Sequence, residues 1–284
     1  MKILVTGATG FLGSHVVKNI LVHGHTVIAT SRNRENTEEL FPQSKNLKYI
    51  QKDLNDKEEN YYMFFECPER VIHLSWQGLP RYNELFHIEQ NLSANYYFIK
   101  NMVGHGLANI TITGTCFEYG LLEGCLAENM DTRPVTIYGL AKDTLRKFVE
   151  TLQKKYGFSL KWLRLFYPFG EGQGSKSLYS QMKDAVFSKQ KEFDMSAGEQ
   201  IRDYLPAEKM AEYIVKTALQ DTIGGVINCC SGKPISVRNF VENYFKEHNH
   251  PIKLNLGYYP YLDYEPLAFW GDTEKLTTAI GTLE

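Results

Sequence analysis

Tyr138 and Lys142, four residues apart in the chain, carry side chains that could move a proton. On a helix, positions i and i+4 lie on one face, so this phenol and this ammonium would lie side by side. A nearby ammonium favours the phenolate and would lower the pKa of the tyrosine from its ordinary value of about 10. Tyr138 is therefore a candidate general acid or base. An exposed aromatic–lysine pair without a chemical role would show the same spacing.

A hydroxyl from a second segment could act on the same substrate atom. The apolar run 109–113 is typical of a buried strand, and Gly114 and Thr115 follow it. Open α/β sheets bind their ligands at the carboxyl edge of the strands. We therefore expect Thr115 to donate a hydrogen bond to the substrate oxygen that Tyr138 protonates.

Three glycines near the N-terminus indicate a site for an anion. Residues 2–6 are typical of a short buried strand, and Gly7, Gly10 and Gly13 lead from it into a helical pattern. Glycines permit a tight turn and a close approach of backbone, and the N–H groups and dipole of the following helix attract a phosphate. The spacing G-x-x-G-x-x-G differs from the better-known G-x-G-x-x-G. A bound dinucleotide is the leading hypothesis; otherwise the glycines only tighten a turn.

The elements that would position these groups alternate along the chain. We expect strands at about 2–6, 26–31, 47–52, 70–75, 109–114 and 159–166, and helices at about 11–23, 83–104, 139–157, 177–189 and 207–220. Continuous apolar strands indicate burial on both faces of a parallel sheet. The pattern predicts an α/β fold with a doubly wound parallel sheet. A dinucleotide-binding domain is expected over 1–166, with about 207–230 interleaved, and a smaller substrate-binding lobe over most of 167–284.

Composition narrows the class of protein. The chain has 284 residues and a net charge of -2, which gives no indication of a nucleic acid or membrane partner. No stretch approaches the roughly 18 apolar residues of a membrane span. The N-terminus shows no signal-peptide pattern, and the five cysteines show no metal-ligand spacing, so no metal is expected. An odd number of cysteines fits a reducing compartment, and we expect a cytoplasmic protein.

The order of the motifs resembles that of a known family. The segments that match are Gly7-x-x-Gly10-x-x-Gly13, Asp53-Leu54, Val71-Ile72-His73-Leu74, Thr115-x-x-x-Tyr119-Gly120, Tyr138-x-x-x-Lys142, Arg164-x-x-x-Pro168-x-Gly170 and Arg202-Asp203-Tyr204. Over nearly its full length the chain resembles the extended short-chain dehydrogenases/reductases, NAD(P)-dependent epimerases, dehydratases and reductases of sugar nucleotides. The pattern is most similar to that of the sugar-nucleotide 4-ketoreductases. The resemblance implies a Rossmann fold.

The resemblance also implies a role for each matching residue. The catalytic residues would be Thr115, Tyr138 and Lys142, and the substrate would contact Thr115, Tyr167 and Arg202. The cofactor would contact Gly7, Gly10, Phe11, Leu12, Gly13, Asp53, Leu54, Leu74, Asn91, Tyr138, Lys142, Tyr167 and Pro168. Arg202 could instead be an ordinary surface ion-pair residue. The family usually has Asn where this chain has Tyr167, so its recognition of the sugar is expected to be unusual.

The residues after the second strand bear on the choice between NAD and NADP. The chain reads Thr30-Ser31-Arg32-Asn33-Arg34 there, without the carboxylate that would accept a hydrogen bond from the ribose 2′-OH. Guanidinium groups and a hydroxyl fit a phosphate. We therefore expect NADP(H), contacted by Ser31 and Arg32, rather than NAD(H). Alternatively, both arginines only solvate the loop.

Departures from the family pattern bear on the reaction. Dehydratases of the family carry Asp-Glu directly after the catalytic threonine, where this chain has Cys116 and Phe117. Glu118 comes one position too late to replace that glutamate, and Cys116 is expected to pack. The resemblance therefore favours NADPH-dependent reduction of the 4-keto group of a nucleotide-linked 4-keto-6-deoxyhexose, in deoxysugar synthesis for surface polysaccharide. The alternatives are an NAD-dependent sugar-nucleotide 4-epimerase and a non-catalytic NADP-sensing protein.

One predicted helix carries more apolar residues than a single sheet face requires. The predicted helix 83–104, with Leu85, Ile88, Leu92, Tyr96 and Ile99, could form a homodimer interface together with the helix of Tyr138. Aromatic residues between 258 and 270 could line the sugar pocket or pack a lobe.

Overall fold

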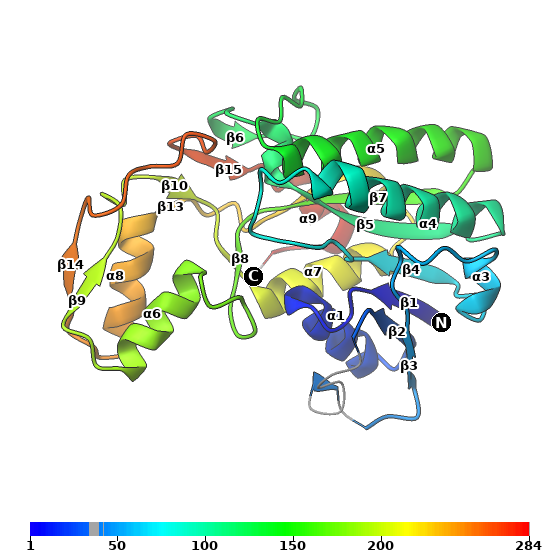
Figure 1. Ribbon diagram of the computed structural model, residues 1–284, viewed down its shortest axis with the longest axis horizontal. Helices are drawn as coiled ribbons and strands as arrows, with labels where there is room; N and C mark the ends of the chain where they lie inside the picture. Colours follow the sequence, from blue (N-terminus) through cyan, green and yellow to red (C-terminus); the bar gives the residue numbers. More distant parts are fainter. Residues whose placement is uncertain (34–39, 42, 284) are drawn as a thin grey trace.

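Seven parallel strands form the doubly wound sheet that the alternating pattern predicts (Figure 1). The computed structural model describes residues 1–33, 40–41 and 43–283. The sheet order is β12-β7-β5-β4-β1-β2-β3. Its strands are β1 (Lys2–Thr6), β2 (Thr26–Ser31), β3 (Leu47–Gln51), β4 (Arg70–His73), β5 (Asn109–Thr115), β7 (Ser159–Leu165) and β12 (Gly225–Cys229).

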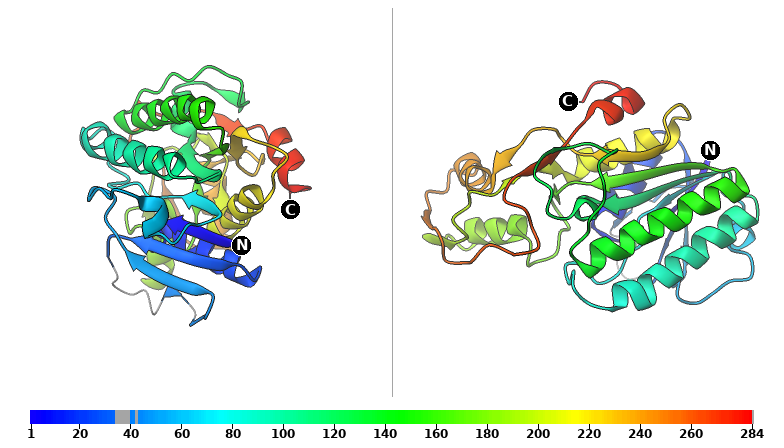
Figure 2. Two further views of the ribbon diagram at one scale, coloured as in Figure 1. Left: turned by 90° about the vertical axis from the view of Figure 1, so that its right-hand side faces the viewer. Right: turned by 90° about the horizontal axis from the view of Figure 1, so that it is seen from above.

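Alternate residues of the strands enter two separate apolar cores. Ile3 and Val5 pack on the side of α1 (Phe11–Val22) and α7 (Ala207–Leu219), and Leu4 packs on the side of α4 (Ser93–Gly104) and α5 (Ile137–Tyr156). Successive side chains of a strand point to opposite faces, so both faces are buried between helices (Figure 2). This burial explains why the strands are continuous apolar runs.

Several elements differ from those expected from the sequence. The predicted helix 83–104 begins at His87 with a π-helical turn, η1 (His87–Leu92), that continues into α4. The strand β12 and the helices α8 (Val237–Glu247) and α9 (Glu274–Ile280) were not predicted. A 3₁₀ turn, η2 (Cys116–Tyr119), follows β5. A short helix, α3 (Tyr61–Phe64), packs beside α4.

Short strand pairs and two helices lie beyond the carboxyl ends of the sheet strands (Figure 1). The helices are α6 (Leu178–Phe187) and α8, which pack together. The strand pairs are β9 (Glu192–Asp194) with β14 (Lys253–Asn255), β10 (Ile201–Arg202) with β13 (Ile235–Ser236), β8 (Pro168–Phe169) with β11 (Leu205–Pro206), and β6 (Gly124–Leu126) with β15 (Phe269–Gly271). The division into a domain over 1–166 with 207–230 and a lobe over most of 167–284 stays a prediction.

Helices α4 and α5 pack against each other and leave apolar side chains in solvent. Leu140 and Phe148 on α5, and Leu85 and Ile88 before and within η1, are exposed, whereas Ile99 is buried. The homodimer expected through these helices stays a prediction. Among the described residues, no helix combines the length and the apolar character needed to cross a membrane.

Candidate active site

The turn between β1 and α1 requires glycine at two positions. Gly7 has a φ of +67°, and a Cβ there would lie 3.0 Å from the Ser75 backbone. At Gly13, in the first turn of α1, a Cβ would lie 2.1 Å from the Gly7 carbonyl oxygen. The N-cap residue Gly10 offers no side-chain cap, and the first turn holds no acidic residue. The N–H groups at the start of α1 are therefore available to an anion, and the cradle fits the pyrophosphate of a dinucleotide.

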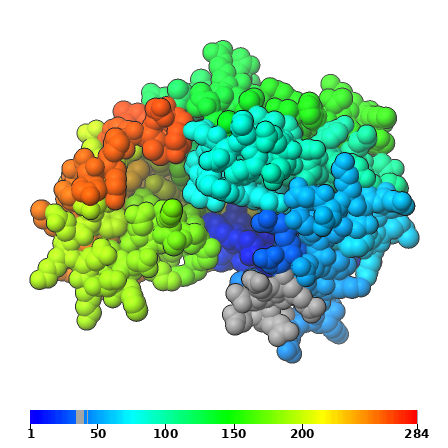
Figure 3. Space-filling model, in the orientation of Figure 1, coloured from blue at the N-terminus to red at the C-terminus, as the bar shows by residue number. Residues whose placement is uncertain are grey.

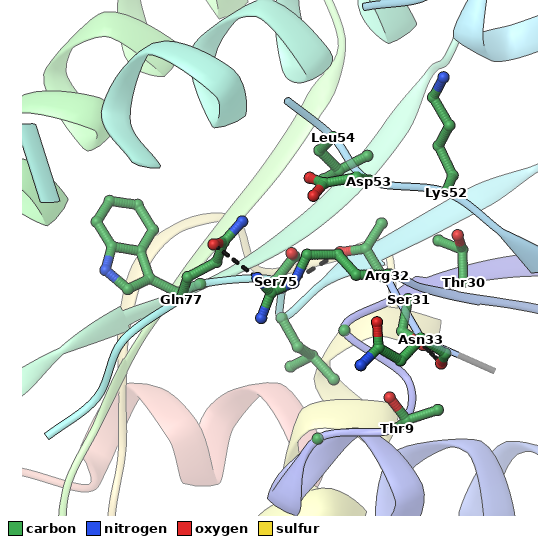
Figure 4. A pocket seen from close by; sticks show the side chains of 15 residues that line it. Thr9, Thr30, Ser31, Arg32, Asn33, Lys52, Asp53, Leu54, Ser75 and Gln77 are labelled. Atoms are coloured by element: carbon green, nitrogen blue, oxygen red, sulfur yellow. Dashed lines mark hydrogen bonds between the residues drawn. The ribbon is translucent and has the colours of Figure 1, made fainter. Parts of the chain in front are cut away.

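A cavity of about 240 Å³ opens beside this turn, at the carboxyl ends of the first four sheet strands (Figure 4). In Figure 3 the N-terminal residues lie at the floor of a hollow between the two parts of the molecule. The cavity is lined by Thr6, Gly7, Thr9, Gly10, Thr30, Ser31, Arg32, Asn33, Lys52, Asp53, Leu54, Leu74, Ser75, Trp76 and Gln77. Most of the predicted cofactor residues upstream of residue 90 are among them.

Other predicted cofactor residues lie outside this lining. Phe11, Leu12 and Gly13 form the first turn of α1, which begins at the cradle. Asn91 is buried, and its amide donates to the Gln77 carbonyl at 3.0 Å. Asn91 therefore fixes the segment 74–77 that lines the cavity, without lining the cavity itself. Tyr167 does not line the cavity.

The end of β2 carries hydroxyl and guanidinium groups and, among the described residues, no carboxylate. The Ser31 hydroxyl lies 2.6 Å from the hydroxyl of Tyr49. The Arg32 Nη1 donates to Gln77 Oε1 at 2.8 Å across the cavity (Figure 4). Arg34 lies outside the described residues. Asp53, on the opposite wall, accepts from the backbone N–H of Asn55 at 3.0 Å.

The predicted catalytic residues come together at the carboxyl end of β5. Tyr138 lies in the first turn of α5, where the Thr136 hydroxyl accepts from the Gly139 N–H at 3.0 Å. Thr115 is the last residue of β5, and its side chain lies close enough to that of Tyr138 to lower the pKa of the phenol. Both side chains, and that of Lys142, are buried.

The electrostatics of Tyr138 differ from the expectation. Burial raises the pKa of Tyr138 above its ordinary range, neighbouring Tyr82 adds to this, and only the side chain of Thr115 opposes it. The predicted lowering of this pKa by Lys142 is wrong for this structure, because the ammonium is turned elsewhere. Tyr138 is protonated at neutral pH and so can serve as an acid.

The Lys142 ammonium is held in a buried pocket. Its Nζ donates to the Thr113 carbonyl at 2.8 Å and lies 4.1 Å from the centroid of the Trp76 ring. Burial lowers the pKa of Lys142 to about 7, while the charge of Glu118 opposes this shift. A cation–π contact and one carbonyl replace only part of the hydration that the ammonium has in water.

Glu118 points away from the reacting groups, as its late position in the motif predicts. Its carboxylate accepts from the Thr115 N–H at 3.0 Å, from Trp162 Nε1 at 2.9 Å and from Arg164 Nε at 2.8 Å. The neighbouring Cys116 is buried, and burial raises the pKa of its thiol above the ordinary range. Neither residue is placed to exchange protons with a substrate.

His73 is a satisfied core residue. Its Nε2 lies 2.6 Å from Asn95 Oδ1 and its Nδ1 lies 2.7 Å from Thr6 Oγ1. The Asn95 amide nitrogen donates to the Asn91 carbonyl, so the Asn95 oxygen must accept a proton from Nε2. Burial lowers the pKa of His73 to about 3, and the imidazole stays neutral.

Arg202 is buried, so the alternative of a surface ion pair is wrong. Its Nη2 donates to Glu265 Oε2 at 2.8 Å, and its Nη1 donates to the carbonyls of Ile201 and Leu267 at 2.9 and 3.1 Å. The guanidinium lies over the ring of Tyr167, 5.5 Å from its centroid. Arg202 and Tyr167 thus lie together but away from the cavity that Arg32 lines.

Sequence reasoning missed Lys52, Trp76 and Gln77, which line the cavity. Each lies within a few residues of the end of a sheet strand, β3 or β4. Their place after a predicted strand is the one signal that could have found them.

A Rossmann sheet, a glycine cradle and a buried tyrosine–lysine–threonine group at the carboxyl edge define a nucleotide-dependent short-chain dehydrogenase/reductase. Residues 3–230 match the model of the NAD dependent epimerase/dehydratase family. The chain belongs to this family, which confirms the resemblance seen in the sequence.

Characterised relatives and solved structures support this membership. The chain is similar to the dTDP-6-deoxy-L-talose 4-dehydrogenase (NAD(+)) of Aggregatibacter actinomycetemcomitans, with 31% identity over 95% of this chain and 99% of that protein. It is 24% identical to a UDP-glucose 4-epimerase of Corynebacterium glutamicum, over 99% of this chain and 90% of the relative. A UDP-glucuronic acid 4-epimerase from Bacillus cereus, solved with UDP-glucuronic acid and NAD, has the same fold, with a TM-score of 0.87 at 20% identity over 99% of this chain and 93% of that one.

Gly13→Ala is expected to weaken cofactor binding. The added Cβ would overlap the Gly7 carbonyl oxygen, so the cradle or α1 must shift. Overpacking of this kind costs about 1–3 kcal/mol, which corresponds to roughly a ten- to hundred-fold rise in the dissociation constant. Titration calorimetry with NADPH and NADH measures it. Gly174→Ala, whose added Cβ meets nothing within 4 Å, is the matched control, and equal affinities for the two variants would refute the cradle.

The buried ammonium of Lys142 predicts a pH-dependent stability. Its pKa is lowered from 10.5 to about 7, so between these values the unfolded chain binds more protons than the folded protein. The free energy of unfolding should therefore rise with pH in this window, by up to about 1.4 kcal/mol per pH unit, relative to Lys142→Met. Urea unfolding of both proteins between about pH 6.5 and 9.5 tests this, and parallel profiles would contradict it.

Proposed function

We propose that the protein is an NADPH-dependent reductase of the 4-keto group of a nucleotide-linked 4-keto-6-deoxyhexose. The observation that carries this proposal is the buried group of Tyr138, Thr115 and Lys142 at the carboxyl end of β5, with Tyr138 and Lys142 one turn apart on α5. The relative named as a dTDP-6-deoxy-L-talose 4-dehydrogenase supports oxidation–reduction at C4, since a 4-dehydrogenation run in reverse is a 4-keto reduction. As expected from the sequence, the reaction would serve deoxysugar synthesis in the cytoplasm.

The side chains supply the proton and hold the oxygen. Bound nicotinamide would supply the hydride to the carbonyl carbon. Tyr138 donates its phenolic proton to the carbonyl oxygen, and Thr115 donates a hydrogen bond to the same oxygen as negative charge develops there. Lys142, four residues along the same helix, would stabilise the phenolate that remains on Tyr138 once its ammonium turns from the Thr113 carbonyl toward that oxygen.

The cofactor would be held from several elements. The glycine cradle with Phe11 and Leu12 would bind the pyrophosphate, and Leu74 would line the path after β4. Asp53 and Leu54 would flank the adenine. Asn91 would act through the Gln77 segment, and the backbone of Tyr167 and Pro168 would meet the nicotinamide. The sugar nucleotide would contact Thr115, Tyr167 and Arg202, whose guanidinium fits a phosphate.

A sugar-nucleotide 4-epimerase is the second candidate. Relatives named as 4-epimerases match nearly the whole chain, and the same three catalytic side chains could serve that reaction. An epimerase would consume no net NADPH, whereas a reductase oxidises one NADPH for each sugar. A non-catalytic NADP sensor has no use for a buried proton donor at the end of β5.

Tyr138→Phe is expected to lower kcat by at least about a hundred-fold, because it removes the proton donor. NADPH affinity should change little, since the ring remains. Stopped-flow or steady-state NADPH oxidation with dTDP-4-keto-6-deoxyglucose gives the rate, and calorimetry gives the affinity. Tyr156→Phe, at the other end of α5, is the matched control. A fully active Tyr138→Phe protein would exclude the proposed mechanism.

Arg32→Ala is expected to weaken NADPH binding about ten-fold or more while NADH binding stays the same. A charged hydrogen bond to a 2′-phosphate contributes about 1.5–3 kcal/mol, and NADH lacks that phosphate. Michaelis constants for both cofactors measure the effect. Arg238→Ala, which removes an exposed ion pair with Glu242, is the control. A preference of the parent enzyme for NADH, as the name of the 31%-identical relative suggests for that protein, would overturn the assignment.

A further inference from the structure

The hydroxyl of Tyr167 is a buried polar group without a hydrogen-bond partner among the described residues. Its ring is fixed on several sides, with centroids 5.8 Å from Tyr204, 5.8 Å from Phe269 and 6.5 Å from Phe117. The ring therefore cannot easily turn to bring the hydroxyl to solvent. Leaving a hydroxyl buried and unbonded is unfavourable, and most such groups in folded proteins are satisfied.

Two other buried tyrosines, Tyr119 and Tyr61, have hydrogen-bond partners for their hydroxyls. The Tyr119 hydroxyl donates to Asn228 Oδ1 at 2.8 Å, and the Tyr61 hydroxyl donates to the Asp56 carbonyl at 3.0 Å. The arrangement at Tyr167 is therefore not a general feature of how this fold buries phenols. It points to a partner that arrives with a ligand.

The position of the hydroxyl indicates which part of a ligand it meets. Tyr167 follows β7 at the same sheet edge as Thr115, which pairs in register with the last residue of β7. Electrostatically, its closest charged or titratable neighbours include Glu265, Cys116 and Arg202. Cys116 directly follows Thr115. The ring of Tyr167 thus lies beside both the turn that follows Thr115, 6.5 Å from Phe117, and the Arg202–Glu265 pair, 5.5 Å from the guanidinium.

The charges around the hydroxyl favour a neutral partner. Arg202 lies over the Tyr167 ring and is paired with Glu265 at 2.8 Å, so the two opposite charges near the phenol largely offset each other. Burial keeps the pKa of Tyr167 well above its ordinary value, so the phenol stays a neutral donor and acceptor. A sugar hydroxyl, which is neutral and can both donate and accept, fits these requirements.

We propose that Tyr167 determines specificity by a hydrogen bond between its phenol and a ring hydroxyl, at C2 or C3, of the sugar in the nucleotide-linked substrate. This inference rests on the proposed function, because it takes Thr115 as the site of the reacting carbonyl. The sugar enters from the side of Glu265, the partly exposed member of the group. Tyr167 then selects hexoses that carry the hydroxyl over analogues that lack it.

Tyr167→Phe and Tyr119→Phe form a matched pair for the test, because each removes only a buried hydroxyl. Thermal unfolding without ligand should show a Tm for Tyr167→Phe that is unchanged or raised by roughly 2–4 °C, since an unsatisfied group is lost. Tyr119→Phe loses a made hydrogen bond, so its Tm should fall. A fall of Tm for Tyr167→Phe equal to that of Tyr119→Phe would show that the hydroxyl has a partner within the protein, and would overturn the proposal.

Binding to sugar nucleotides completes the test. Calorimetry with a dTDP-linked 6-deoxyhexose should show a roughly ten-fold weaker affinity for Tyr167→Phe than for the parent protein. One of the two analogues, the 2-deoxy or the 3-deoxy sugar, lacks the hydroxyl that Tyr167 contacts. For that analogue the parent protein and Tyr167→Phe should bind with equal affinity, about ten-fold more weakly than the parent binds the full sugar. The Tyr119→Phe protein should match the parent throughout.

The outcomes separate this inference from the proposed reaction. A Tyr167→Phe protein that binds the full sugar and both analogues as the parent does would overturn the role of Tyr167, even if 4-keto reduction is observed. Absence of NADPH oxidation with every 4-keto sugar nucleotide would overturn the reaction, whereas the calorimetric difference would still support the contact. Calorimetry needs no turnover, so the two results are independent.

Discussion

The buried carboxylate of Glu118 holds the reacting end of the sheet in place. It pairs with Arg164 on the neighbouring strand, accepts from Trp162, and caps the turn that begins at Thr115. The packing leaves no room for a side chain at Gly114, where a Cβ would lie 2.4 Å from the Glu118 oxygen. A buried ion pair of this kind is costly to break, because either charge left alone is desolvated without a partner. The direction of the Thr115 hydroxyl therefore depends on a salt bridge between the turn η2 and the strand β7.

The same turn sets the start of α5 and thus the position of the phenol. A Cβ at Gly139 would lie 2.7 Å from the carbonyl oxygen of Phe117, so α5 approaches the turn as closely as its backbone allows. On the other side, the Tyr138 N–H donates to the Tyr82 carbonyl at 2.8 Å. Residues from three segments thus fix one tyrosine. Motif spacing alone names the tyrosine and the lysine, but only this packing fixes where the phenol lies and raises its pKa above the ordinary value.

The fold could be predicted because it depends on local pattern. Apolar runs such as 71–74 mark strands that are buried on both faces, and the glycine spacing marks the phosphate turn. The candidate site was predictable as far as residue types and strand ends determine it: Thr115, Tyr138 and Lys142 do lie together. The pKa of Tyr138 was not predictable, because it depends first on burial and then on the nearby Tyr82, which is distant in sequence, rather than on Lys142. The ion pair of Arg202 with Glu265 was missed for the same reason, since the partners are 63 residues apart.

The contacts on the two sides of Tyr138 differ in strength. On the side of the sheet, charge-assisted hydrogen bonds join Glu118 to Arg164 in a buried region, where losing one partner costs about 3–5 kcal/mol. On the other side, the ring centroids of Tyr82 and Tyr264 are 6.0 Å apart, and those of Tyr82 and Tyr138 are 5.6 Å apart. Aromatic contacts of this kind contribute only about 0.5–1.5 kcal/mol each. A ligand that replaces these ring contacts with its own apolar surface could therefore displace Tyr82 and Tyr264 at small cost in free energy, while the reacting side chains keep their geometry.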